Sequence, residues 1–137
     1  MIKIIHLPFP EGDGSETVAA EEIGADTYTI LENPIFSCRL NYGTTVKAIA
    51  NEKGDLVVSK VIRASRYKTT KFLLSSVEDQ RIIKEKIGPP LLEIGGTWEI
   101  AMGGLVFIHV PVDSHFELKK LFTDLEFYPT EIIDEQK

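Results

Sequence analysis

The sequence predicts an α+β protein, in which an N-terminal antiparallel β module packs on a ferredoxin-like unit. Short apolar runs separated by close turns fill the first 64 residues, a pattern typical of a small curled sheet or barrel. From residue 65 onwards the expected order is β-α-β-β-α-β, the split βαβ of a ferredoxin-like fold. We therefore expect modules at 1–64 and 65–137 that share one core.

The N-terminal module is expected to contain several short strands. Residues 1–9 alternate and end near a proline, as a first strand does, and a polar turn is expected at 11–15. Residues 16–22 fit a strand or a short helix, although the turn at 24–26 and the alternating run 27–31 favour a hairpin. Further strands are expected at 45–50 and 56–64, joined by a turn around Gly54.

In the second unit a strand is expected at 67–74, followed by a helix that Ser75 and Ser76 cap. The segment 88–90, Gly-Pro-Pro, is expected to interrupt this helix, because prolines lack the backbone donor that a helix interior needs. A second helix is expected at 114–125, where Ser114 and Glu117 have the capping-box spacing and an apolar stripe follows. A short strand at 130–133 would complete the unit.

The hairpin at 97–111 is the centre of the predicted unit. A two-residue turn at 103–104, Gly-Gly, would place Trp98, Phe107 and His109 on one face of the sheet. Residues 105–108 and 110 are apolar on both faces, which predicts a sheet covered on two sides. The N-terminal strands are the expected second cover, and a homodimer packed sheet to sheet is the alternative.

Composition argues against several classes of function. The formal net charge of −6 argues against a general affinity for nucleic acid or anionic lipid. No apolar run approaches the ~20 residues of a membrane helix. The lone Cys38 rules out an internal disulfide, predicts a cytoplasmic protein and is expected to be inert.

Few residues suggest chemistry. His109, on a largely apolar strand, is the most interesting titratable residue, and Glu99 or Glu21 would be its carboxylate partner in an enzyme. We expect His109 to be a core histidine bonded to a backbone carbonyl, and the catalytic base is the alternative. No metal-binding motif and no cofactor fingerprint occurs, so neither a metal nor a cofactor is expected.

The chain resembles a small uncharacterised bacterial family known only as a domain of unknown function. That family has a Glu-x-x-Trp-Ala strand, a Tyr-x-Leu-x-Asn-x-Pro-Phe segment and a Gly-Asp-x-Val turn. A Leu-Gly…Glu stretch and a strand that ends in Val-Pro come later. The residues that fill these places in order are Tyr28, Leu31, Asn33, Pro34, Phe36, Gly43, Val46, Gly95, Glu99, Val110 and Pro111. Ala19 stands in place of the tryptophan, and Thr44 in place of the aspartate. The resemblance implies no activity.

We expect a non-enzymatic binding or regulatory module that takes a protein partner or small ligand in a groove lined by Trp98, Phe107 and His109. One alternative is an immunity-type protein, whose acidic surface would complement a basic toxin. The other is a small hydrolase or isomerase that uses His109 with a nearby carboxylate.

Overall fold

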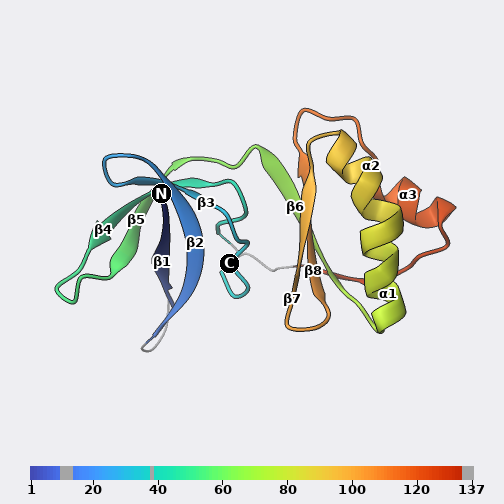
Figure 1. Cartoon of the computed structure of the whole chain (residues 1–137), viewed down its shortest axis with the longest axis horizontal. Helices are drawn as coiled ribbons and strands as arrows, with labels where there is room; N and C mark the ends of the chain where they lie inside the picture. Colours follow the sequence, from blue (N-terminus) through green and yellow to red (C-terminus); the bar gives the residue numbers. More distant parts are fainter. Residues whose placement is uncertain (10–13, 38, 134–137) are drawn as a thin grey trace. The chain divides into compact units, whose positions relative to one another are not determined.

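The computed structural model describes residues 1–9, 14–37 and 39–133 of the chain (Figure 1). Cys38 and most of the expected turn at 11–15 lie outside these residues. The chain divides into two compact units, Met1–Arg66 and Tyr67–Lys137. The regular structure described in the first unit consists of strands, whereas the second unit combines a four-stranded sheet with the described helices, so the protein is a sheet-rich α+β structure.

The described part of the first unit is a closed barrel of five strands, in which β1 also pairs with β5 in parallel. The strands are β1 (Ile2–Pro8), β2 (Ser15–Gly24), β3 (Thr27–Ile30), β4 (Thr45–Ala50) and β5 (Leu56–Arg63). Residues 16–22 therefore form a strand. Alternate side chains along the strands fill the barrel, and the buried ones are Ile5, Leu7, Val18, Ala20, Tyr28, Ile30, Val46 and Ala48, with Leu40 from a loop.

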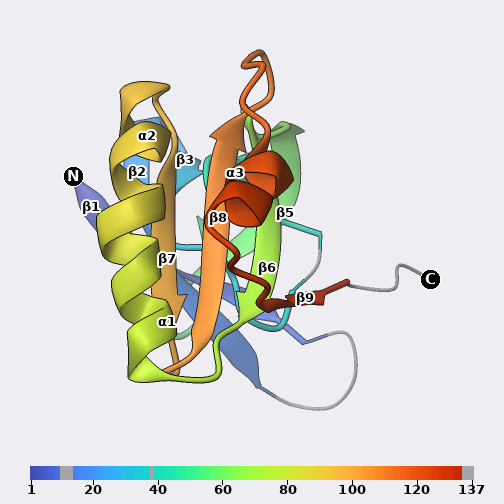
Figure 2. The same cartoon turned by 90° about the vertical axis from the view of Figure 1, so that its right-hand side faces the viewer.

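The second unit contains a four-stranded sheet in the order β7-β8-β6-β9, and all neighbouring strands are antiparallel. Its strands are β6 (Tyr67–Leu73), β7 (Thr97–Ala101), β8 (Leu105–Pro111) and β9 (Thr130–Ile132). The helices lie on one face of this sheet, as Figure 2 shows. They are α1 (Val77–Ile82), the π-helical segment η1 (Ile83–Ile87), α2 (Gly88–Glu93) and α3 (Leu118–Asp124).

The core of the second unit lies between the sheet and these helices. Its buried members are Phe72, Leu74, Ile83, Ile87, Leu91, Val106, Ile108, Phe122 and Phe127. The rings of Phe72, Phe122 and Phe127 stack edge to face in sequence, with centroids 5.1 and 5.2 Å apart.

The expected register of the hairpin is wrong by one residue. Ala101 pairs with Leu105, so three residues, Met102 to Gly104, join the strands. Both Met102 and Gly103 have positive φ, and the carbonyl of Gly104 accepts the N–H of Leu74, which extends the pairing of β6 with β8. Because strand faces alternate, this shift moves Trp98 to the face opposite His109.

The expected helix at 114–125 is shorter in the structure, and its capping box is not formed. The helix begins at Leu118, after Glu117, which makes no side-chain cap. The hydroxyl of Ser114 instead accepts the N–H of Phe116, 3.0 Å away, within the loop that precedes the helix. The serine therefore stabilises a local turn that competes with a helix start.

The expected interruption at Gly88-Pro89-Pro90 is also wrong, because helical structure continues from α1 through η1 to α2. The prolines lie in the first turn of α2, where N–H groups lack partners within the helix and proline costs little. The π-helical segment η1 ends at Ile87 and leads directly into the first turn of α2, which begins at Gly88.

Candidate functional site

Trp98 faces the helices and packs against α2. It pairs with Ile108 across the hairpin, on the face that carries the core of the second unit. A Cβ placed on Gly88 would lie 2.6 Å from Cη2 of Trp98, so the indole lies directly on the helix backbone. Trp98 therefore does not share a face with Phe107 and His109, and its contacts are those of a packing residue.

His109 belongs to a chain of three polar side chains on the other sheet face. Its Nε2 lies 2.5 Å from Oε2 of Glu99, and its Nδ1 lies 2.7 Å from Oγ1 of Thr69. An ionised carboxylate only accepts hydrogen bonds, so a neutral His109 would donate through Nε2 and accept at Nδ1. Glu99 is one of the two carboxylates that the sequence offered as neighbours of His109, whereas Thr69 was not predicted.

A hydroxyl, an imidazole and a carboxylate in this order are the components of nucleophilic triads. His109, however, has no exposed surface, and the side chain of Glu99 is 25% exposed. Phe107 on the same face is also buried, at 1% exposure. The two hydrogen-bond partners described above are side chains, whereas the sequence suggested a backbone carbonyl, and the burial of His109 suits a structural polar network.

Glu21, the other carboxylate considered for an enzyme, belongs to the barrel unit. It lies on β2 opposite Ile2, and its side chain is exposed to solvent. Glu21 is therefore a surface residue of the first unit, whereas His109 belongs to the second.

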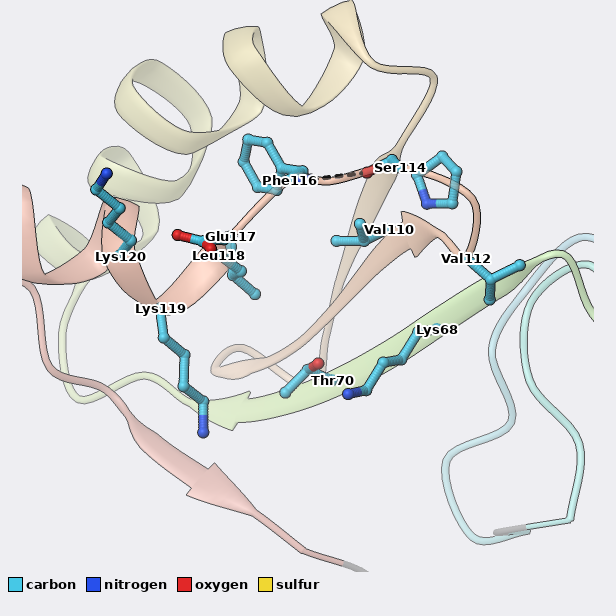
Figure 3. Close-up of a pocket in the computed structure, with 11 residues that line it drawn as sticks. Lys68, Thr70, Val110, Val112, Ser114, Phe116, Glu117, Leu118, Lys119 and Lys120 are labelled. Atoms are coloured by element: carbon cyan, nitrogen blue, oxygen red, sulfur yellow. Dashed lines mark hydrogen bonds between the residues drawn. The ribbon is translucent and has the colours of Figure 1, made fainter.

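A pocket with a volume of about 710 Å³ lies on the helix side of the second unit (Figure 3). It lies between β6, the end of β8 and the segment that leads into α3. Its lining residues are Lys68, Thr70, Val110, Pro111, Val112, Ser114, Phe116, Glu117, Leu118, Lys119 and Lys120. Its size falls in the range of roughly 300–1,000 Å³ that small-molecule sites occupy.

The charge of this pocket differs from that of the whole chain. Three lysines and one glutamate line it, a formal balance of +2, whereas the chain carries −6. Lys119 pairs with Glu131 of β9. Lys119 and Lys120 lie in the first turn of α3, where the helix dipole disfavours cations. Their charges therefore do not stabilise α3 through its dipole.

This pocket was not predicted from the sequence, although one signal was present. Lys68, Thr70 and Phe72 alternate along β6 and therefore share a sheet face. Phe72 is a core residue and Lys68 is exposed, so the apolar cover of this face ends between them. A lysine on a core-facing row of a strand indicates an open end of the core.

Metal ligands and membrane helices are the two remaining features to place in the structure. Among residues 1–9, 14–37 and 39–133, no group of three histidine, cysteine or acidic side chains is placed to hold a metal ion. In the same residues no helix combines the length and apolar character needed to cross a membrane.

Comparison with known proteins identifies the family. Residues 16–127 match DUF4265, a domain of unknown function. The chain belongs to this family. The resemblance found in the sequence is therefore confirmed. None of the curated proteins matches the chain.

A solved structure supports the fold of this DUF4265 member. The chain is similar to a hypothetical protein from Neisseria gonorrhoeae, with a TM-score of 0.62 and 16% sequence identity. The match covers 92% of this chain and 87% of the other. At this identity the likeness concerns the fold alone.

Within the DUF4265 region, side chains that accept backbone hydrogen bonds fix the segment around Asn33 and Pro34. The carboxylate of Glu16, three residues before Ala19, accepts the N–H groups of Ile35, Phe36 and Ser37. The amide oxygen of Asn33 accepts the N–H of Tyr42 at 2.8 Å. These motif positions therefore hold a loop onto the barrel.

Proposed function

We propose that the protein is a non-enzymatic binding module whose ligand site is the 710 Å³ pocket of the second unit. The observation that carries this proposal is the pocket itself, which combines an apolar lining with a few polar groups. That combination is typical of small-molecule sites.

We also class the second unit as ferredoxin-like. The element order and the antiparallel sheet order β7-β8-β6-β9 support this assignment. In such a unit both helical segments lie on one face, and the loop that leads from β8 into α3 crosses that face. The pocket lies under this crossing segment, so it is built from the connection between two elements and a neighbouring strand.

Ligand screening by NMR tests the binding proposal. We expect fragments from a small-molecule library to shift the amide resonances of Thr70, Val110 and Phe116. Val110→Trp should fill the pocket and abolish these shifts, whereas Val77→Trp, at a position that is 81% exposed and outside the pocket, should leave them intact. A library whose members shift only residues elsewhere would refute the proposal.

A second candidate is a small hydrolase or isomerase that uses His109 with Glu99. The hydrogen-bonded chain of Thr69, His109 and Glu99 favours it, because each group has the partner that acid–base chemistry requires. The burial of His109 argues against the enzyme, because a catalytic side chain must be able to contact its substrate.

Diethyl pyrocarbonate, which modifies accessible imidazoles, separates the two candidates. We expect His115, which is exposed, to be modified quickly, and His109 to stay unmodified until the protein unfolds. Peptide mass spectrometry after short exposures gives both rates. Equal rates at His109 and His115 in the folded protein would favour the enzyme.

A further inference from the structure

We propose that the pocket between β6, β8 and residues 111–120 binds an amphipathic monoanion, a carboxylic acid with a short apolar body. This inference rests on the proposed binding function and adds the chemical class of the ligand. The pocket belongs wholly to the second unit, so its lining does not depend on the barrel.

The apolar body of the ligand is matched by one side of the pocket. Val110, Phe116 and Leu118 are half-buried and belong to the edge of the core between the sheet and α3. Figure 3 shows these three side chains above β6, and Val112 to the right of them. A ligand that covers these groups removes apolar surface from water, at roughly 25 cal/mol per Å².

The anionic head of the ligand is matched by the opposite side. Lys68 and Thr70 project from β6, and Figure 3 shows Lys119 directed from the start of α3 towards the same strand. Lys120 is directed away from β6 in this view. The two ammonium groups and the threonine hydroxyl are hydrogen-bond donors that a carboxylate head can use.

The number of uncompensated charges favours a single negative charge on the ligand. Within the described residues Lys68 makes no ion pair, whereas Lys119 is paired with Glu131. Glu117 adds a negative charge to the lining. No arginine is among the lining residues of this pocket, so the bidentate hydrogen bonds by which a guanidinium group recognises a dianionic phosphate cannot form there. A monoanion therefore balances the charges better than a phosphate does.

Calorimetry with simple probes tests the inference. Hexanoate, octanoate and decanoate are titrated into the full chain, with octan-1-ol and octylammonium as probes of matched length. We expect affinity to rise about threefold to fourfold for each added methylene group. Octanoate should bind more tightly than octan-1-ol, and octylammonium more weakly than both.

The charge of Lys68 is tested with a matched pair of variants. Lys68→Gln should weaken octanoate about threefold to tenfold and leave octan-1-ol unchanged. Lys53→Gln, in an exposed turn of the barrel unit, should change neither affinity. Both positions are exposed, so circular dichroism melts should show folded proteins.

The outcomes separate this inference from the proposed function. Equal binding of octanoate and octan-1-ol with shifts at Thr70 and Val110 would overturn the monoanion and leave the binding module standing. Tightest binding by octylammonium, or octanoate binding that Lys68→Gln does not weaken, would also overturn the monoanion. If none of the probes and none of the library fragments shifts the resonances of these residues, both the monoanion and the binding module are overturned.

Discussion

Gly88, under the indole of Trp98, and Gly96 set how closely the helical segment of the second unit approaches its sheet. A Cβ on Gly96 would lie 2.7 Å from the carbonyl oxygen of His109 and 2.6 Å from Cδ1 of Leu91. The carbonyl belongs to the backbone of a central strand and cannot move aside. Gly96 therefore lets α2 turn directly into β7 against the strand that carries His109.

We predict that Gly96→Ala destabilises the protein by about 1–3 kcal/mol or more, because the new methyl group overpacks a rigid strand. Gly24→Ala is the matched control, since its new methyl group would meet Cβ of Thr27 at an ordinary 3.9 Å. Urea unfolding of both variants measures the difference. Equal stability of the two variants would contradict the predicted clash.

At the scale of elements, α1 shows how a local signal in the sequence becomes a formed helix start. Of the two predicted caps, the one at Ser76 is confirmed: its Oγ accepts the N–H of Asp79 at 3.1 Å. In return, Oδ2 of Asp79 accepts the backbone N–H of Ser75 and its hydroxyl, at 2.9 and 2.8 Å. These bonds, led by the one from the backbone of Ser75, hold the pKa of Asp79 below its ordinary value of 3.8.

The lowered pKa predicts a pH dependence of stability. The unfolded chain protonates Asp79 at a higher pH than the folded protein does, so the contribution is complete above about pH 4 to 5 and is lost as pH falls through the lowered folded value. The stability difference between the wild type and Asp79→Asn should stay constant from pH 7 to 5 and shrink below pH 4. Ser75→Ala removes the hydroxyl of Ser75 and keeps its backbone N–H as a donor to Asp79. The stability of this variant should therefore depend less on pH in the same range than that of the wild type. A difference that stays the same at pH 3 would contradict this account.

The loop at 33–37 in the first unit depends on one acidic side chain of β2. Glu16 accepts three consecutive backbone N–H groups there, while Glu21 on the same strand is exposed. We predict that Glu16→Ala speeds amide hydrogen exchange at Ile35, Phe36 and Ser37, because their N–H groups lose their acceptor. Glu21→Ala is the control and should leave these three rates unchanged. Similar exchange in both variants would show that the loop is held by other contacts.

At the scale of the whole molecule, each unit has a core of its own. The barrel encloses one cluster of buried apolar side chains, and the sheet and helices of the second unit enclose another. Ile30 belongs to the first cluster and Ile83 to the second, and both have no exposed surface.

We predict that Ile30→Val and Ile83→Val each cost about 0.5–1.5 kcal/mol and that their costs add in the double variant within about 0.5 kcal/mol. Additivity is expected because the two side chains share no packing partner within their clusters. Urea unfolding of the single and double variants forms the cycle. A coupling above about 1 kcal/mol would show that the two cores act as one.

Local signals in the sequence determined the kinds of elements and their order. The proline and glycine turns, the caps of α1 and the alternation of apolar residues each depend on neighbours in the chain. They predicted the β-rich N-terminal part, the helical segment after Ser76 and the hairpin around Gly103. The motif residues around Asn33-Pro34 also led to the correct family.

Only the tertiary structure decided the register of the hairpin, the start of α3 and the position of the pocket. A shift of one residue in a strand leaves the local pattern unchanged but exchanges its faces, so the sequence could not place Trp98 and His109. Ser114 had a capping sequence, but its hydroxyl bonds inside a loop that the neighbouring strand and helix define. The pocket between β6, β8 and residues 111–120 brings together residues more than forty positions apart in the chain. A pattern of neighbouring residues cannot predict that these segments meet.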